Sequence, residues 1–341
     1  MRVFDVLNLL RLAGPSGTWA LATHAARLRR INRLCLIVTG LTALEKRGLN
    51  EELLSAGGLD LRRHDDLDRH TLGALLEYLY EVGVLDEVVP GVYRAHNRRR
   101  FRRLLRVMYG YYAYHEPVQM LDKLITGECA YGRDVARDDR YDAMASADLT
   151  SHFSYPFSAN LLDGRPFRTL VDMGSGTGRY CVFMADRFPE ARFYGVDLSE
   201  RAVNEGRAQG HESDRVRLRT GDMTKLESID LGHGGVDVFS FMFVLHEFRD
   251  AMVRSILRSI RDTHPAATVL LTELTAKPSH AVRKQRRSLF PELKLVHELS
   301  DQIIRTPDRW KELFAGAGFC LLADRSNALT DHVAMLFAAA A

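Results

Sequence analysis

The stretch LVDMGSGTGRY, residues Leu170 to Tyr180, decides how the rest of the chain is interpreted. It places Gly174, Gly176 and Gly178 after a short apolar run and before a helical pattern. Glycine lets the backbone turn tightly at such a point and approach a ligand without a Cβ atom in the way. The stretch therefore predicts a strand, a ligand-binding loop and a helix.

The segments that follow this loop alternate between β-prone apolar runs and helical patterns. Strands are predicted at ARFYGVDLS (191–199), VRLRTGDM (216–223), VDVFSFMFVL (236–245), ATVLLTEL (267–274), FCLLADRS (319–326) and HVAMLFAAA (332–340). The alternation is typical of an α/β fold built on a doubly wound, Rossmann-like sheet. We expect this domain to occupy residues 165–341.

The first third of the chain has helical periodicity. Apolar residues recur every three to four positions in residues 41–59 and 71–88, and Pro90–Gly91 then predicts a turn between two short β-prone runs. Helices followed by a hairpin predict a mainly helical, winged-helix-like domain at 1–105. Residues 106–164 are expected to form a helical linker that covers the active site.

Composition excludes several classes of protein. The chain has 341 residues, a net charge of +3 and four widely spaced cysteines, which disfavours a polyanionic partner and a disulfide scaffold. The basic run at 98–106 is interpreted as a solvated helix face with inward apolar residues, and no run is long enough to span a membrane. We expect a cytoplasmic protein with no nucleic-acid or membrane partner.

Carboxylates surround the glycine loop at spacings that suit a nucleoside ligand. Asp172 precedes the loop, and Asp197 ends the next predicted strand 19 residues after Gly178. A carboxylate at that place can accept both ribose hydroxyls. Asp222 and Met223 end the third strand with a carboxylate and a flexible apolar side chain suited to an adenine.

The Asp172–Gly178 segment resembles the first motif of the class I S-adenosylmethionine (SAM) methyltransferases, which has the form E/DxGxGxG. The N-terminal pattern and the phrase RTPDRWKELFAGAGF (305–319) extend this likeness to the small-molecule methyltransferases of secondary metabolism. The resemblance implies SAM as cofactor, a small-molecule substrate, and a homodimer formed through the N-terminal domain.

The segment MFVLHEFRD (242–250) carries the first catalytic candidate. In the O-methyltransferases that the chain resembles, the fourth strand ends in a phrase like LHDW whose histidine is the general base, and LHEF puts His246 at that position. Glu273 matches the family glutamate that orients the base. A histidine with a pKa near neutral is suited to take a proton from an acidic hydroxyl.

Two departures from that pattern favour a different reaction. Glu247 replaces the usual aspartate, and LVHELSD (295–301) supplies His297, with Glu298 beside it. Two histidines with carboxylates are typical of a metal site with open positions, and the chain is similar in this to the metal-dependent 2-oxo acid C-methyltransferases. The favoured hypothesis is therefore a Zn or Fe ion on His246, His297 and Glu247, which assists methylation of the β-carbon of a 2-oxo acid in non-ribosomal peptide biosynthesis.

Two alternatives remain open at this stage. One is O-methylation of a phenol or enol with His246 as the base. The other is a winged-helix regulator that binds SAM without catalysis, which the combination of an intact loop, Asp197 and His246 disfavours. Binding to duplex DNA would indicate the regulator, and methyl transfer to a small acid would exclude it.

Overall fold

The computed structural model describes residues 3–231, 235–284, 290–327 and 331–340. The chain divides into two compact units, Met1–Met108 and Tyr109–Ala341. Helix α4 (Arg98–Gln119) contributes residues to both of them. Among the described residues, no helix is long and apolar enough to cross a membrane.

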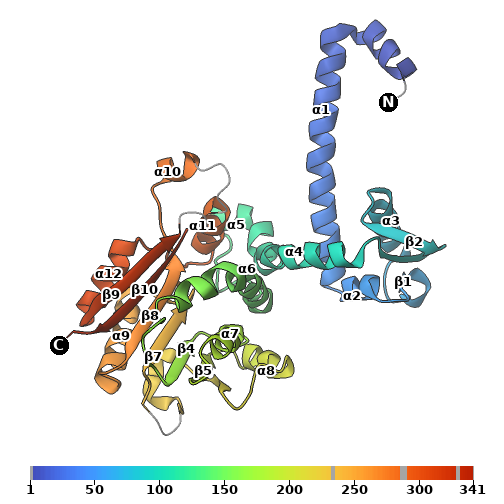
Figure 1. Cartoon of the computed structure of the whole chain (residues 1–341). Helices are drawn as coiled ribbons and strands as arrows, with labels where there is room; N and C mark the ends of the chain where they lie inside the picture. Colours follow the sequence, from blue (N-terminus) through green and yellow to red (C-terminus); the bar gives the residue numbers. More distant parts are fainter. Residues whose placement is uncertain (1–2, 232–234, 285–289, 328–330, 341) are drawn as a thin grey trace. The chain divides into compact units, whose positions relative to one another are not determined.

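The first unit combines helices with a small antiparallel sheet. Helix α1 (Val3–Glu45) bends where Gly14 has a φ of 67° and Pro15 follows, as Figure 1 shows. The other elements are α2 (Leu49–Leu54), β1 (Leu59–Asp60), a 3₁₀ turn η1 (Leu61–Arg63), α3 (Arg69–Glu81), β2 (Leu85–Val89) and β3 (Val92–Ala95). The strands pair in the order β1-β3-β2. This mainly helical arrangement agrees with the predicted fold class.

Two helices of this unit end earlier than their periodicity predicted. The helix expected over residues 41–59 is interrupted by Gly48, which has a φ of 72° and separates α1 from α2. The helix expected over 71–88 ends at Glu81, and Gly83 has a φ of 78° before β2 begins. A positive φ is nearly free for glycine and ends a helix, whereas the apolar spacing continues through the break. The turn at Pro90–Gly91 between β2 and β3 is confirmed.

The second unit contains a sheet of seven strands in the order β6-β5-β4-β7-β8-β10-β9. The strands are β4 (Thr169–Met173), β5 (Arg192–Asp197), β6 (Val216–Thr220), β7 (Val238–Met242), β8 (Thr268–Leu274), β9 (Phe319–Asn327) and β10 (His332–Ala339). The first five are parallel, and β10 runs antiparallel to both β8 and β9. The predicted doubly wound sheet is therefore confirmed.

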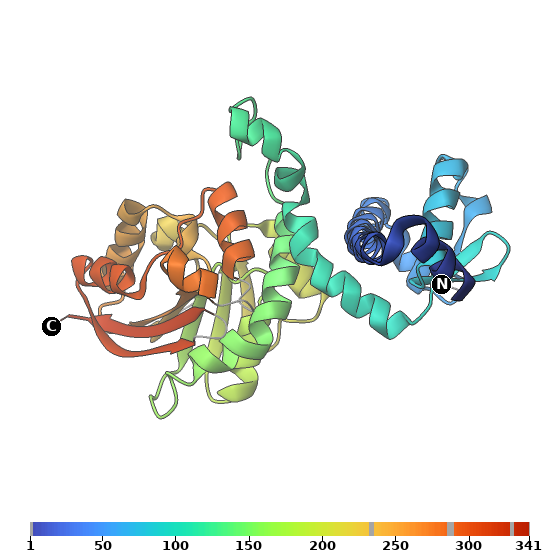
Figure 2. The same ribbon diagram turned by 90° about the horizontal axis from the view of Figure 1, so that it is seen from above.

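Helices cover both faces of this sheet, as Figure 2 shows. The helices that the second unit contains after α4 are α5 (Leu121–Thr126), α6 (Asp139–Ala159), α7 (Arg179–Arg187), α8 (Glu200–Ala208), α9 (Asp250–Thr263), α10 (Ser279–Lys284), α11 (Phe290–Leu299) and α12 (Pro307–Gly316), with 3₁₀ turns η2 (Met223–Ser228) and η3 (Leu245–Glu247). One core joins α9 and α12 to the sheet, and a second joins α6, α7 and α8 to it. Alternate strand residues therefore point into different cores.

The winding of the sheet reverses between β4 and β7. From β4 the chain proceeds outward through β5 and β6, and it then returns to add β7 and β8 on the opposite side. Open α/β sheets bind ligands outside the carboxyl ends of the strands where the winding reverses. The glycine loop and the segment around His246 both begin at this edge.

Candidate active site

The glycine loop after β4 leaves space for a ligand. Gly176 has a φ of 55°, and a Cβ atom built on it would meet nothing within 4 Å. At Gly178, which caps α7 with a φ of 78°, a Cβ atom would lie 2.4 Å from Cδ2 of Leu218. Gly174 also has a positive φ. Glycine is required at these positions by backbone conformation, and the open side of Gly176 is where a ligand can approach the loop.

Asp172 is a carboxyl group that the sheet buries almost completely. Its side chain is 1% exposed and accepts a hydrogen bond of 2.6 Å from the hydroxyl of Ser240 on β7. Burial, assisted by the charge of Asp197, outweighs the hydrogen bond from Ser240 and raises the pKa of Asp172 to about 7. A carboxylate in this state gains from a cationic ligand that enters the site.

Asp197 ends β5 with its carboxylate held over the loop. Its oxygens accept hydrogen bonds from the backbone N–H groups of Gly176 at 2.7 Å and Ser199 at 2.8 Å. The next residue, Leu198, is 73% exposed, and no motif had singled it out. Oγ of Ser175 is buried in the loop and has no hydrogen-bond partner among the residues that the structure describes. These features suit a nucleoside whose sugar hydroxyls reach Asp197 and whose base covers an apolar side chain.

Asp222 and Met223 lie at the start of η2, after β6. Asp222 accepts hydrogen bonds from the N–H and the hydroxyl of Thr224 at 2.9 and 2.6 Å, which lower its pKa. Met223 is partly buried and packs against the core beneath the sheet edge. The strand predicted over 216–223 therefore ends earlier, at Thr220, and both residues follow β6, the strand next to β5.

A strained residue turns the chain from β7 toward the catalytic candidates. Phe243 has a φ of 54°, its N–H donates to the carbonyl of Thr272, and its ring packs edge-on against His332 at 4.7 Å between centroids. Non-glycine residues adopt such a φ only where the surroundings enforce it, and these positions cluster at functional sites. The turn brings His246, on η3, over the end of β8.

His246 and Glu273 form a buried pair, 5% and 1% exposed. Nδ1 of His246 donates to Oε2 of Glu273 at 2.7 Å, while Oε1 accepts from the backbone N–H groups of Val244 and His246. Burial alone would lower the pKa of His246, but the charge and hydrogen bond of Glu273 outweigh it, so the net shift is upward. With Nδ1 engaged, Nε2 is the atom available to take a proton.

His297 lies beside this pair, although 51 residues separate the two histidines in the sequence. The rings meet edge to face, with 5.0 Å between their centroids, and His297 is 8% exposed. Its Nδ1 is 2.6 Å from the carbonyl oxygen of Leu293. Burial, with the charge of His246 as a second cause, lowers the pKa of His297 to about 4. The ring is therefore neutral at physiological pH.

Glu247 is engaged by side chains of the protein, Arg137 and Gln302. Its Oε1 accepts hydrogen bonds from Arg137 at 2.7 Å and from Gln302 at 2.6 Å, and it lies 3.8 Å from Nε2 of His246. Burial raises the pKa of Glu247, but the charges of Arg137 and His246 outweigh it and the net shift is downward. An arginine that neutralises the carboxylate reduces its value as a metal ligand.

The predicted metal site is not supported. Within the residues that the structure describes, no group of three His, Cys, Asp or Glu side chains is placed to hold a metal ion. Glu298, expected beside the two histidines, pairs instead with Lys294, and its side chain is 58% exposed. The pattern identified the two histidines, but it could not show that Glu247 faces Arg137, because that partner is 110 residues away in the sequence.

Comparison with known proteins identifies the type of domain to which the sheet belongs. Residues 170–264 match the family model described as "Methyltransferase domain". The chain contains a SAM-dependent methyltransferase domain. Its open glycine loop, the buried carboxylate of Asp172 and the unpartnered hydroxyl of Ser175 fit a cofactor that carries both a cation and a nucleoside. The matched segment begins in β4 and extends beyond His246.

The curated relatives of this domain are named for different reactions. The chain is 26% identical over 275 residues, 73% of its length and 77% of the relative's, to the phenazine O-methyltransferase PhzM of Lysobacter antibioticus. It is 27% identical over 226 residues, 62% and 58% of the two lengths, to the aclacinomycin 10-hydroxylase RdmB of Streptomyces purpurascens. For the first three curated relatives, the alignment covers between 28% and 77% of the relative's length, and less than two thirds in two of them.

Solved structures resemble the chain over nearly its whole length. The mitomycin 7-O-methyltransferase MmcR superposes with a TM-score of 0.63 at 19% identity, covering 95% of this chain and 100% of that one. At this identity the likeness concerns the fold. It includes the helical N-terminal region as well as the sheet.

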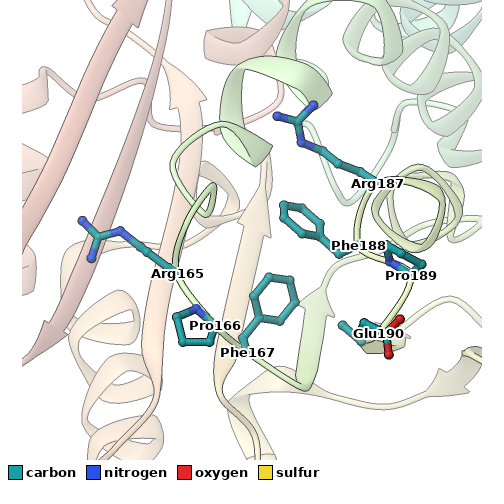
Figure 3. Close-up of a pocket in the computed structure, with 8 residues that line it drawn as sticks. Arg165, Pro166, Phe167, Arg187, Phe188, Pro189 and Glu190 are labelled. Carbon is teal, nitrogen blue, oxygen red and sulfur yellow. The ribbon is translucent and has the colours of Figure 1, made fainter.

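A hollow lies at the amino ends of β4 and β5, away from the candidate active site. Figure 3 shows its lining, which comes from the segment before β4 and the segment between α7 and β5, with a volume of about 200 Å³. Phe167 and Phe188 pack edge to face with 5.0 Å between their centroids, and Arg187 already pairs with Asp163 at 2.6 Å. This hollow precedes the amino ends of β4 and β5 and does not belong to the candidate active site.

Proposed function

We propose that the chain is a SAM-dependent O-methyltransferase that acts on a small hydroxylated molecule, such as a phenol or enol, in secondary metabolism. The observation that carries this proposal is the buried His246–Glu273 pair, in which the carboxylate holds Nδ1 and leaves Nε2 as a base. Two of the named relatives and neighbours, PhzM and MmcR, are O-methyltransferases.

Some residues of the site would bind the cofactor, and others would position and deprotonate the substrate. Asp197 would accept the ribose hydroxyls, Leu198 and Met223 would contact the adenine, and Asp172 would offset the positive charge of the cofactor. When bound, SAM supplies a methyl group that a nucleophilic oxygen can take, leaving S-adenosylhomocysteine. The protein has to place that oxygen and remove its proton.

His246 removes the proton. Nε2 accepts it from the substrate hydroxyl as the oxygen attacks, so the product is a neutral methyl ether and the proton stays on the imidazole. Glu273, fixed by two backbone N–H groups, stabilises the imidazolium that forms. The proton then leaves to solvent before the next cycle. This arrangement suits a hydroxyl that is acidic enough for imidazole to deprotonate.

Metal-assisted C-methylation of a 2-oxo acid receives less support than O-methylation. The convergence of His246 and His297 favours it, but Glu247 and its partner Arg137 disfavour a metal there. Arg137 also pairs with Asp139 and Asp142, which leaves its guanidinium poorly placed to bind a substrate carboxylate.

The test is methyl transfer from labelled SAM to a panel of phenols, enols and 2-oxo acids, followed by mass spectrometry. We expect methyl ethers, full activity after treatment with EDTA, and loss of transfer in His246→Ala with unchanged SAM affinity. Methylation of a 2-oxo acid that needs added metal would contradict the proposal. SAM binding without any methyl transfer would instead indicate other chemistry, as the name of the hydroxylase RdmB illustrates for a relative.

We also infer that the protein is a homodimer through the N-terminal unit. Helix α1 exposes Leu28, Ile31 and Leu34, at 50%, 61% and 65%, three residues apart on one stripe. Exposed apolar stripes of this kind are typical of interfaces with another chain. A second copy of the same helix is the partner that its repeated spacing and the family resemblance favour.

A further inference from the structure

The tautomers of His246 and His297 are fixed by their neighbours. Nδ1 of His297 lies 2.6 Å from a backbone carbonyl oxygen, which can only accept, so Nδ1 carries the proton and donates. Nδ1 of His246 likewise donates to the carboxylate of Glu273. A neutral imidazole with a proton on Nδ1 has a lone pair on Nε2. Each ring therefore presents a hydrogen-bond acceptor.

Within the part of the chain that the structure describes, neither acceptor receives a hydrogen bond. Among the described residues, Nε2 of His297 and Nε2 of His246 have no hydrogen-bond donor, although both side chains are more than nine-tenths buried. The neighbouring Glu247 is a third acceptor, and Arg137 and Gln302 already donate to its Oε1. Neither Nε2 atom is among the fully buried polar atoms that lack a partner, so both stay accessible to a ligand. A ligand that supplies donors can therefore gain a hydrogen bond here, worth about 1 kcal/mol.

Only one of the two imidazoles is needed as the base. His246 has the carboxylate partner that stabilises an imidazolium, whereas His297 has a backbone carbonyl and a pKa of about 4, so it stays neutral and accepting. The lone pair of His297, one ring away from the base, is left for another group of the substrate. A 2-oxo acid offers only acceptors at its reacting end and does not complement this pair.

We propose that the substrate carries a second hydrogen-bond donor, a hydroxyl or amino group next to the hydroxyl that is methylated, and that Nε2 of His297 accepts from it. This inference rests on the proposed O-methyltransferase function and narrows its substrate class to catechol-type and ortho-amino phenols. His297 is then a specificity-determining residue. It selects against substrates that have hydrogen, an ether or a carboxylate at the neighbouring position.

The test compares three ligands that differ only at that position. 4-Methylcatechol has the second donor, 4-methylphenol lacks it, and 2-methoxy-4-methylphenol replaces it with an acceptor. We expect wild-type kcat/KM for the catechol to exceed that for each monophenol about tenfold, which is the value of one hydrogen bond. In His297→Leu this preference should disappear, mainly through loss of activity on the catechol, while 4-methylphenol is little affected.

Two further variants test whether the acceptor at position 297 causes the preference for the catechol. His297→Gln, which keeps an acceptor, should restore part of the preference. Glu298→Gln changes the next residue of α11, whose side chain is exposed, and should leave the preference unchanged. Because a leucine at position 297 can disturb the fold, calorimetry with S-adenosylhomocysteine should first give wild-type affinity for each variant, and binding of the three ligands to the loaded protein provides a readout independent of turnover.

The outcomes separate this inference from the proposed function. Equal activity of wild-type protein on the three ligands, or a preference that survives in His297→Leu, would overturn the role of His297 and leave O-methylation intact. A preference that disappears with EDTA would also overturn it, because the histidines would then act through a metal. Absence of methyl transfer to any phenol would contradict the proposed function itself, while the binding measurements would still decide the question of the second donor.

Discussion

Nδ1 of His246 lies 2.7 Å from Oε2 of Glu273, and the same carboxylate receives the backbone N–H of His246 at 3.2 Å. One side chain thus fixes both the ring and the main chain of the base. This double attachment is possible because β7 and β8 are adjacent and parallel, with Met242 paired to Thr272.

Replacing Glu273 with glutamine should change the pH dependence of the reaction. The base must be neutral, so activity rises with pH through the pKa of His246, which lies above 6.5 in the wild-type protein. Without the carboxylate, burial dominates and the midpoint should move downward, while kcat falls about 10- to 100-fold. A profile of kcat/KM from pH 5 to 9 measures both effects. An unchanged midpoint in Glu273→Gln would show that the pair does not act as proposed.

Asp172→Asn should remove a pH dependence from SAM binding. Asp172 has a pKa of about 7 in the unliganded protein, so it is increasingly ionised between pH 6 and pH 8, and the ionised form attracts a cationic ligand. Wild-type affinity for SAM should therefore increase over this range. In Asp172→Asn the affinity should be lower and nearly flat. Calorimetry at three pH values tests this, and a slope that persists in the variant would exclude Asp172 as its source.

The same substitution should stabilise the protein without SAM at pH 8. A carboxyl with a raised pKa binds its proton in the folded state at a pH where the unfolded chain has lost it, so stability is lost as pH rises from about 4 to about 7. Asparagine carries no charge and can still bond to Ser240. We expect a gain of roughly 1 kcal/mol or more at pH 8 and little gain at pH 4, measured by urea denaturation. Destabilisation at both values would contradict this.

Asp197→Ala should weaken SAM binding without changing the fold of the sheet. The variant loses the acceptor for the ribose hydroxyls and for the N–H groups of Gly176 and Ser199. Loss of charged hydrogen bonds corresponds to an increase in Kd of about 10- to 100-fold. Calorimetry provides the measurement, with the exposed Glu200→Gln as a control. Wild-type affinity in Asp197→Ala would contradict the placement of the nucleoside.

Charges on the exposed stripe of α1 should break the proposed dimer. The double variant Ile31→Glu and Leu34→Glu places two carboxylates where we expect an apolar interface, and light scattering at micromolar concentration should give the mass of a monomer. Ile125→Glu, at a residue that is 78% exposed on α5, is the matched control and should remain dimeric. A wild-type protein that is already monomeric would contradict the inference.

The sheet could be predicted from the sequence because apolar runs and the glycine loop are both local features of the chain. Apolar runs mark each strand, and Gly174 to Gly178 mark the turn where backbone conformation allows few other residues. The placement of His246 on the turn after β7 and of Glu273 on β8 follows from the same alternation. Helix ends were predicted less well, since Gly48 and Gly83 interrupt periodic patterns that continue past them.

The side chains around the histidine pair were harder to predict, because the residues that contact them are distant in the sequence. Nothing near Glu247 indicates that Arg137 and Gln302 would hold it, and without that contact two histidines and a glutamate resemble a metal site. Leu198 was missed because a single exposed apolar residue is common on any surface. Its place directly after Asp197 is the signal that identifies it.

The site draws its parts from regions that can change independently. The proposed base lies on η3, directly after β7, and its carboxylate lies on β8, the strand paired with β7, whereas Arg137, His297 and Gln302 come from a helix and connecting segments outside the sheet. Substitutions in those segments reshape the substrate wall while the proton-transfer pair keeps its geometry. Descendants of one ancestral gene can thus acquire new substrates without rebuilding the catalytic step, and substrate diversification in this lineage should concentrate at positions such as 137, 297 and 302.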